Sequence, residues 1–256
     1  MNLAEMLEYT AGQFLDDRTE LIEGDSDNLW SDEYLTRMFN EAQNILCRRS
    51  WAIIEYGVAP SGVITLATGK ILYPLHASIL RVFDATPSTQ TAVLGRADDA
   101  QIRDTSLVTP YPADAFNAVE LGTRASLAGG SATLSGAPLA FATDAGTRTL
   151  RVFPPPTSTQ NGLKVSLKVA RKPITYLSVD TPDGAPEVGD EFHVAICEFA
   201  AGKALTLPLV DADQKVEGRR LLAAFDEVVR QARQERIRAE MGSNRWEFSS
   251  STAAVW

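Results

Sequence analysis

The sequence is poor in the side chains that carry metal-ion or acid–base chemistry. It contains two histidines and two cysteines in 256 residues. Two cysteines cannot form a disulfide framework, and Cys47 and Cys197 lack the spacing of a zinc site. The motifs HxH, HExxH, CxxC and GxSxG are also absent from the sequence. We therefore predict no catalytic residues, no metal site and no cofactor, and that the protein is not an enzyme.

Long hydrophobic runs and targeting patterns are missing as well. No apolar run reaches the roughly 18 to 20 residues of a membrane-spanning helix, so we expect no membrane association. The opening MNLAEMLEYT has neither the basic region nor the apolar core of a signal peptide, so we expect none. The glycine-containing stretch 126–136 lacks a lysine after its glycines, which favours a surface hairpin over a nucleotide-binding loop.

Charge is concentrated at one end of the chain. The net charge is −9, and residues 1–33 carry ten acidic side chains and one basic side chain. The remaining residues therefore carry equal numbers of both signs. An acidic segment repels nucleic acid, and a neutral body gives it no basic footprint. The seven bases between Asp213 and Met241 alternate with six acids, which favours contacts between helices over phosphate binding.

Apolar periodicity predicts helices at both ends of the sequence. Residues 2–16 show one helical stripe, with Asn2 and Glu5 spaced as a capping box. A stronger helix begins after Ser31, a good N-cap, and ends near Arg49. Cys47 is predicted to be a core thiol beside the stripe of this helix.

Two further helices are expected near the end of the chain. A helix beginning at Asp190 or Glu191 is apolar nearly all round, so it is either buried on most faces or packed between subunits. We interpret His193 on this helix as a helix-surface or core-edge histidine bonded to a backbone group, with a catalytic base as the alternative. Residues 211–241 form the final helix, followed by Gly242 as a stop signal.

The middle of the chain, from Trp51 to about Val179, is typical of short strands separated by turns. In Leu163–Val169 apolar residues alternate with polar ones, which predicts a strand with one wet face. We expect Thr149–Phe153 and Leu163–Ala170 to form a long-looped hairpin. The other expected strands are Trp51–Tyr56, Gly62–Ala67, Ile79–Phe83, Phe116–Leu121 and Leu139–Thr143.

These elements predict an α+β fold, in which N- and C-terminal segments form a helical bundle, with an antiparallel β-sandwich or barrel domain inserted between these segments in the sequence. The expected organisation is an acidic helix or arm (1–29), a helical domain (30–50 and 186–241), a β-rich domain (51–185) and a docking tail (242–256).

The tail is polar but contains three aromatic residues, more than a solvated segment requires. They either fold back on the domain or anchor a partner, since aromatic and arginine side chains are enriched at interfaces. The candidate partner-binding residues are Arg245, Trp246, Phe248 and Trp256.

Three segments resemble head-to-tail adaptor (connector) proteins of short-tailed bacteriophages. Residues 29–49, with Asn40, Glu41 and Ala42 at their centre, resemble the first helix of that family. Residues 149–155 and 163–173 resemble its late hairpin, and Pro186–Val188 followed by Phe192–Ile196 resembles the segment before its penultimate helix. The likeness covers roughly 30–245, and residues 1–29 are expected to depart from it.

The resemblance implies a structural protein of the virion, made in the host cytoplasm and placed at the head–tail interface. Such adaptors form a ring, commonly a dodecamer, below the portal protein, and carry the tail nozzle or tube. DNA passes through the channel without specific binding during ejection, and the C-terminal tail docks on the portal. Lateral helix contacts in a ring make Arg219, Arg230, Arg233 and Arg236 candidate subunit-interface residues.

Two other functions stay open at this stage. A β-sandwich binding module recognising a carbohydrate or a protein would need an exposed row of aromatics, and the strands offer little beyond Trp51, Tyr56 and Phe83. An enzyme of unrecognised type would need polar residues that converge from distant segments. For residues 1–33 we hypothesise either a channel lining or an exposed arm.

Overall fold

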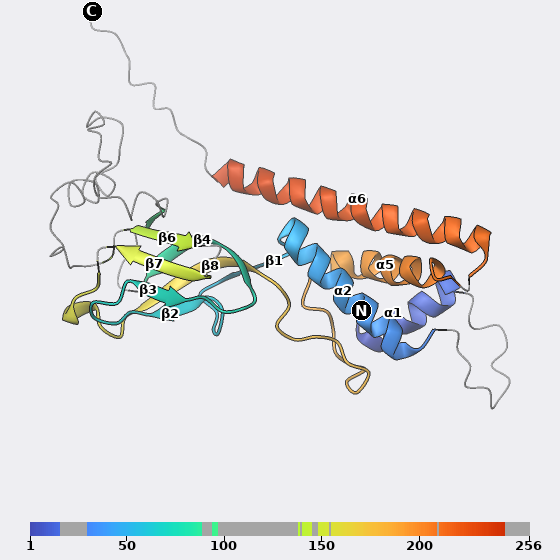
Figure 1. The fold of residues 1–256 in the computed structure, drawn as a ribbon, viewed down its shortest axis with the longest axis horizontal. Coiled ribbons are helices and arrows are strands. Elements are labelled where there is room, and N and C mark those ends of the chain that lie inside the picture. Colours follow the sequence, from blue (N-terminus) through green and yellow to red (C-terminus); the bar gives the residue numbers. More distant parts are fainter. Residues whose placement is uncertain are drawn as a thin grey trace, which may run out of the picture. The chain divides into compact units, whose positions relative to one another are not determined.

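The computed structural model describes residues 1–15, 30–88, 94–96, 138, 140–144, 148–153, 155–208 and 210–243. The chain divides into two compact units (Figure 1). Met1–Ala52 and Pro173–Trp256 form the first, called here the helical unit, and Ile53–Lys172 form the second, the β unit. The chain therefore passes between the units twice, after Ala52 and after Lys172.

The helical unit contains the helices expected from both ends of the sequence. They are α1 (Leu3–Thr10), the π-helix η1 (Ala11–Leu15), α2 (Asp32–Ser50), the 3₁₀-helix η4 (Asp190–Phe192), α5 (His193–Leu205) and α6 (Ala212–Ser243). The predicted capping box of Asn2 and Glu5 is confirmed at the start of α1. Ser31 is confirmed as the N-cap of α2, because its Oγ accepts a hydrogen bond from the Tyr34 N–H. Gly242 lies in the last turn of α6, not beyond it.

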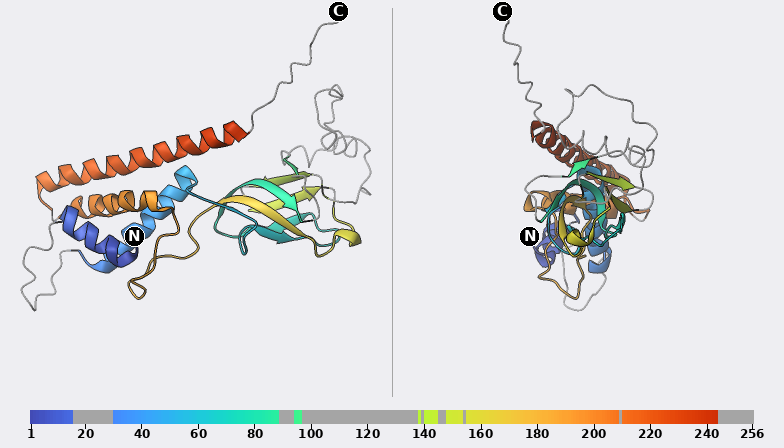
Figure 2. Two further views of the ribbon diagram at one scale, coloured as in Figure 1. Left: turned by 180° about the vertical axis from the view of Figure 1, so that it is seen from behind. Right: turned by 90° about the vertical axis from the view of Figure 1, so that its left-hand side faces the viewer.

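The apolar helix α5 lies at the centre of this unit, between α6 and the pair α1 and α2 (Figures 1 and 2). Ten of its thirteen residues are buried. Its neighbours belong to the same chain, so burial within one subunit accounts for its composition. A neighbouring subunit is not needed to cover α5.

Two glycines allow α5 and α6 to approach closely. A Cβ atom on Gly202 would lie 2.9 Å from the Gly218 carbonyl oxygen and 2.9 Å from Leu222 Cγ. A Cβ atom on Gly218 would lie 2.9 Å from Leu205 Cβ. Glycine inside a helix costs about 0.5–1 kcal/mol relative to alanine. At these two positions only glycine leaves room for the backbones of α5 and α6 to pack against each other.

The β unit consists of two four-stranded sheets. In the first, β8 (Lys164–Arg171) pairs with β4 (Ile79–Pro87) on one edge and with β1 (Ile53–Tyr56) and β2 (Val63–Thr65) on the other. The second has the order β3 (Leu72–Pro74), β7 (Thr149–Phe153), β6 (Ala140–Asp144) and β5 (Gly95–Arg96). All pairs are antiparallel except β5 with β6, which are parallel. A 3₁₀ turn, η3 (Ser158–Gln160), precedes β8.

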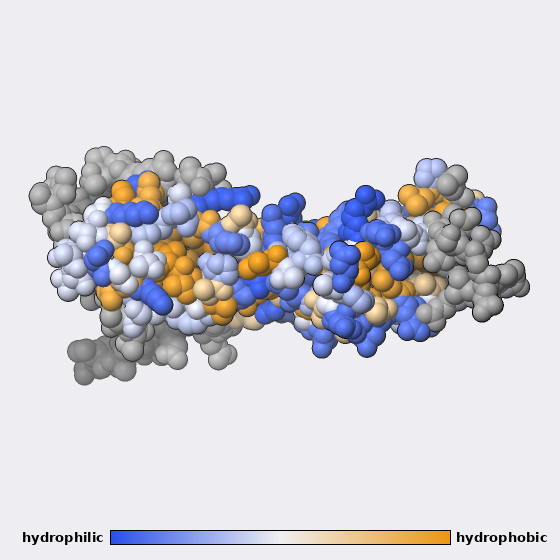
Figure 3. All heavy atoms as spheres, turned by 90° about the horizontal axis from the view of Figure 1, so that it is seen from below, coloured by the Kyte–Doolittle hydropathy of each residue, from blue (hydrophilic) through white to orange (hydrophobic). Residues whose placement is uncertain are grey.

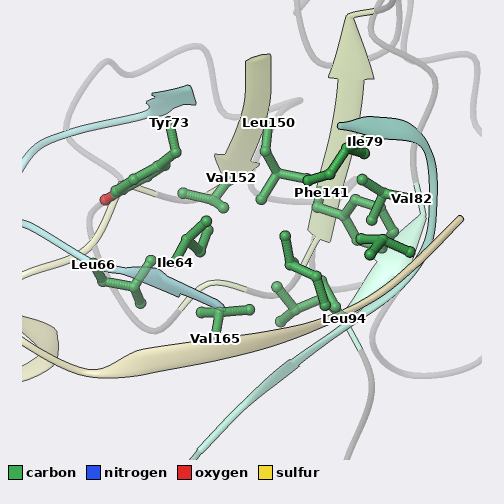
Figure 4. Close-up of a cluster of buried hydrophobic side chains, with 13 residues drawn as sticks. Ile64, Leu66, Tyr73, Ile79, Val82, Leu94, Phe141, Leu150, Val152 and Val165 are labelled. Carbon is green, nitrogen blue, oxygen red and sulfur yellow. The ribbon is translucent and has the colours of Figure 1, made fainter. Parts of the chain in front are cut away.

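A cluster of apolar side chains from both sheets forms the core of this unit (Figure 4). Val165, Leu167 and Val169 of β8 are completely buried in it, which confirms the alternation predicted for this strand. From the second sheet Phe141, Leu150 and Val152 point into the same cluster. The α+β class is therefore confirmed, with two packed sheets and not a closed barrel.

Some predictions for the strands were wrong. β7 and β8 do not form a hairpin, because each pairs within a different sheet. The loop between them contains consecutive prolines, which lack the N–H that strand pairing needs, and it carries the chain across to the other sheet.

Strand β4 extends to Pro87, beyond the predicted end at Phe83. Two register shifts interrupt its alternation, which hides the period of two from sequence reading. β3 and β5 are too short to give a pattern, and the expected strand Phe116–Leu121 lies outside the described residues.

Candidate partner-binding surfaces

The residues predicted to dock on a partner lie beyond the described part of α6. Arg245, Trp246, Phe248 and Trp256 follow Ser243, where the description of the C-terminal segment ends. Their anchoring role therefore stays a prediction.

Two of the four predicted interface arginines contact their own chain at the end of α2. The Arg233 guanidinium carbon lies 3.5 Å from the centre of the Trp51 ring, and Nη1 donates to the Arg49 carbonyl at 3.3 Å. Arg236 Nη2 donates to the Ala52 carbonyl at 3.5 Å. Trp51 has a left-handed backbone (φ 57°) and closes α2 by donating to the Cys47 carbonyl. We call these contacts of Trp51 and Ala52 with α6 the arginine clamp.

The clamp satisfies carbonyl groups that a helix end leaves without partners. Arg49 adds an ion pair with Asp226 of α6, at 2.6 Å between Nη1 and Oδ1, although both side chains are more than half exposed. Exposed pairs of this kind contribute about 0–1 kcal/mol. The clamp thus fixes the end of α2 against α6, just before the chain leaves the helical unit.

The other two predicted interface arginines lie on the outside of α6. Arg219 is exposed, and Arg230 is exposed and paired with Glu227 three residues earlier. Arg233 and Arg236 have a role within the subunit, and a role between subunits stays a prediction for all four.

Asn40, Gln43 and Asn44 of α2 form hydrogen bonds with residues 176–187, far away in the sequence. Asn40 Nδ2 donates to the Leu177 carbonyl at 2.9 Å, and the Leu177 N–H donates to Asn40 Oδ1 at 2.9 Å. A side-chain amide thereby imitates the paired bonds of a neighbouring strand. Asn44 Oδ1 accepts from the Tyr176 hydroxyl at 3.2 Å, and Gln43 Oε1 accepts from the Glu187 N–H at 3.2 Å.

Glu187 closes the same segment from its other end. Its Oε1 accepts hydrogen bonds from the backbone N–H groups of Ile174 and Thr175. Asn40 and Glu187 belong to two of the motifs on which the resemblance rests, and the structure brings these motifs together through Gln43. Their residue types are explained by hydrogen bonds that hold residues 173–189, which we call the anchored loop.

Helix α1 holds the anchored loop as well. The N–H groups of Leu3 and Ala4 donate to the carbonyls of Gly184 (2.8 Å) and Pro182 (3.0 Å). These N–H groups belong to the first turn of α1, which has no intrahelical acceptors for them. The loop therefore caps α1 while α1 immobilises the loop.

The histidine and the two cysteines of the helical unit, which are its most reactive side chains, make structural contacts. His193 is 2 % exposed, and its Nε2 lies 3.3 Å from the Val188 carbonyl, so the prediction of a histidine bonded to a backbone group is confirmed. Burial lowers the pKa of His193. Burial raises the pKa of the Cys197 thiol to about 11, and Cys47 is fully buried. A neutral imidazole at His193 and an undissociated thiol at Cys197 favour structural roles for both.

The described ranges contain neither a candidate metal site nor a candidate membrane-spanning helix. Within them, no group of three or more His, Cys, Asp or Glu side chains could hold a metal ion. No helix there is both long and apolar enough to cross a membrane.

The β unit offers a basic and aromatic outer face on its first sheet. Arg81 and Lys168 lie over the Phe83 ring at 5.2 and 5.9 Å, and Tyr56 is 56 % exposed. Trp51, the third candidate for an exposed aromatic row, is buried in the arginine clamp of the helical unit. The aromatic row expected of a carbohydrate-binding module is thus reduced to Tyr56 and Phe83.

At the edge of the same sheet Glu55 forms a partly buried ion pair with Arg171 and accepts from Ser61 Oγ at 2.8 Å. The hydrogen bond from Arg171 is the main reason why the pKa of Glu55 is lowered. Because the neighbouring strands β1 and β8 are paired at these residues, the ion pair secures the edge of the sheet.

Apolar side chains reach the surface of both units among hydrophilic ones (Figure 3). In the helical unit the anchored loop has three of them: Ile174 is 40 % exposed, Tyr176 49 % and Val179 37 %. No sequence pattern singled out these residues, because they show neither helical nor strand periodicity.

Comparison with known proteins identifies a family for this chain. A search of curated proteins finds no match. The model of the SU10 adaptor protein family matches residues 1–247, which confirms the resemblance to phage adaptors. The expectation that residues 1–29 depart from the family is wrong, and Leu3 and Met6, buried in the helical unit, show that the start of the chain is part of the fold. The protein belongs to the SU10 adaptor protein family.

Proposed function

We propose that this phage adaptor joins the portal to the tail, forming a ring, as a dodecamer, below the portal protein. The single observation that carries the proposal is the family match over residues 1–247. An adaptor family implies a structural component of the virion that contacts other phage structural proteins. In this role the ring extends the DNA channel at the head–tail interface and carries the tail nozzle or tube.

The role is mechanical and uses no catalysis, metal or cofactor. The side chains that an enzyme would need are engaged in the fold: His193 with a backbone carbonyl, and Cys47 and Cys197 in the core. The charged side chains Arg233, Arg236 and Glu187 hold backbone groups. These contacts give a rigid building block and support an assembly function.

The charge distribution supports a channel through which DNA passes without specific binding. Outside residues 1–33 the chain is neutral, so it lacks the strong positive field that holds phosphates. The described beginning of the acidic segment is a helix, with Leu3 and Met6 buried and Glu5 and Glu8 exposed. We propose that the acidic side chains of residues 1–33 line the channel or form an arm beside it. Finding them buried between subunits of an assembled ring would contradict this.

The experiment is sedimentation of the purified chain, alone and mixed with the portal ring of the same phage. We expect a ring on the portal, and a chain that never joins the portal would contradict the proposed function. The C-terminal anchor is tested by deleting residues 244–256, which contain Arg245, Trp246, Phe248 and Trp256. The deletion should abolish portal binding with an unchanged circular dichroism spectrum. Unchanged assembly would show that these residues are not the anchor.

A further inference from the structure

The anchored loop exposes three apolar side chains, which we call the apolar ridge. Ile174, Tyr176 and Val179 are each more than a third exposed, whereas Leu177, Pro186 and Val188 are buried and fasten the loop to the helical unit. Aromatic side chains that combine an apolar ring with a polar tip, such as Tyr176, are typical of protein interfaces.

The ridge is already ordered in the single subunit. Asn40 and Glu187 hold the backbone of residues 174, 175 and 177, and α1 holds residues 182 and 184. The Tyr176 hydroxyl is fixed by Asn44. Ordering interface groups is a large part of the free-energy cost of association. Because folding of the subunit already orders this loop, little further ordering is needed when it binds a partner.

Opposite charges distinguish this loop from one part of α6. The anchored loop contains three acidic side chains and no basic one, and two of them, Asp180 and Asp183, are exposed. Residues 227–239 of α6 contain four arginines and two glutamates, and the arginines outside the clamp, Arg230 and Arg238, are exposed. Complementary charges steer association and fix its register.

One face of α6 combines the exposed arginines with an apolar residue. Arg230, Gln234 and Arg238 follow at four-residue spacing, and Ile237 lies beside them at seven residues from Arg230. Arg230, Gln234 and Arg238 are exposed and Ile237 is half-buried. We call these four residues the α6 face. Its arginines suit Asp180 and Asp183, and Ile237 suits the ridge.

We propose that the apolar ridge of the anchored loop binds the α6 face of a neighbouring copy of this chain. The inference rests on the proposed ring and names the two surfaces that meet in it. Because the ridge and the α6 face are different surfaces, the contact is heterologous, and repetition of such a contact forms a ring when the rotation between neighbours closes. The partner is thus a second copy of this chain.

Two charge-reversed proteins test the pairing. The first carries Asp180→Lys and Asp183→Lys, and the second carries Arg230→Glu and Arg238→Glu. Each alone should lose assembly by about tenfold or more, since like charges then face each other across every contact. An equimolar mixture should restore assembly, because each loop then meets an α6 face of opposite charge in the other protein. Sedimentation velocity, alone and on the portal ring, measures the result.

The control protein carries Asp211→Lys and Asp213→Lys, the same change of charge at exposed positions near the start of α6. It should assemble like the wild type. If either reversed protein assembles normally, or if the mixture does not recover, the pairing is overturned while the adaptor function stands. If the wild type assembles neither alone nor on the portal, the proposed function falls and the pairing with it.

A second measurement is independent of charge. A protein with Thr175→Cys and Gln234→Cys places exposed thiols on the two surfaces, while Cys47 and Cys197 are buried. Mild oxidation of the assembled protein should give a ladder of disulfide-linked oligomers on a non-reducing gel. The single variants should give at most dimers. An assembled double variant that yields no ladder would overturn the proposed contact.

Discussion

The helical unit and the β unit are stabilised in different ways. The β unit depends on apolar side chains from two sheets, and strands β7 and β8 both supply completely buried residues. The helical unit has an apolar helix at its centre, but hydrogen bonds from side chains to distant backbone groups fix the segments around it. Asn40 and Leu177 are separated by 137 positions in sequence, and Arg233 and Arg49 by 184. The difference teaches that α2, the anchored loop and α6 depend on a few polar residues for their positions.

The largest loss of stability is expected from the core of the β unit. Leu167→Ala should lower the free energy of unfolding by about 2–5 kcal/mol, because it removes buried methyl groups and leaves a cavity. Urea unfolding followed by circular dichroism measures the change. Lys168→Ala, on the outer face of the same strand, should change it by less than about 0.5 kcal/mol. Equal losses in the two variants would refute the two-sheet core.

The contact of α5 with α6 should be the most sensitive apolar site of the helical unit. Gly218→Val should cost about 1–3 kcal/mol, since the added side chain overlaps with Leu205 of α5. Ala223→Val, at an exposed position on the same helix, is the matched control and should cost a few tenths of a kcal/mol. Tryptophan fluorescence during urea unfolding reports the change, because Trp30 and Trp51, the tryptophans among the described residues, lie in the helical unit. A control as destabilised as Gly218→Val would show that helix propensity, not close packing, is responsible.

Removal of the Asn40 side chain should have an intermediate effect that is confined to the helical unit. Asn40→Ala leaves the N–H and the carbonyl of Leu177 without their partner, which should cost about 1–3 kcal/mol. Hydrogen exchange should become faster at Leu177 and remain unchanged in β8. Asn44→Ala, which removes the exposed bond from Tyr176 and a bond from Nδ2 to the Asn40 carbonyl but leaves both bonds to Leu177 in place, is the control and should cost less. Exchange at Leu177 that is the same in both variants would contradict the role of Asn40.

The smallest effect should be a difference in the pH at which the two units weaken. Burial lowers the pKa of His193 in the folded state, so the unfolded state takes up the proton first. The contribution of His193 to the free energy of unfolding of the helical unit should therefore be constant above the ordinary pKa of 6.5 and decrease as the pH falls below it. The pKa of Glu55 is lowered from 4.5, so its contribution to the β unit is complete above that value and lost as the pH falls through the folded pKa.

Tryptophan fluorescence and hydrogen exchange, recorded between pH 4 and 8 under moderate urea, measure the pH at which each of the two units loses stability. His193→Gln should remove the fall near pH 6 from the helical unit. Weakening of both units at one pH, unchanged in that variant, would assign the effect to other groups.

Short-range patterns explain which features could be predicted from the sequence. The capping box of Asn2 and Glu5 involves neighbouring turns of one helix, and the alternation of Leu163–Val169 follows from the geometry of a single strand. Both were predicted correctly because each depends on residues a few positions apart. The predicted hairpin of β7 and β8 was wrong because strand order depends on which sheet buries each apolar face.

For the predicted site residues as well, the residue types can be read from the sequence, but their contacts cannot. Arginines on α6 are visible in the sequence, but nothing local shows that Arg233 and Arg236 turn to the end of α2 while Arg219 and Arg230 face outward. Ile174, Tyr176 and Val179 gave no pattern at all, and only the anchored loop makes them neighbours on a surface.

The sequence by itself determined the scarcity of catalytic side chains, the acidic beginning of the chain, and the order helix, strand, helix. These are sums and periodicities, which need no knowledge of distant contacts. The tertiary structure decided that α5 is covered by its own chain, that Asn40 and Glu187 hold one loop, and that two of the four arginines serve the fold. The physical reason is that a side chain which satisfies a backbone group more than 100 positions away leaves no trace in local spacing.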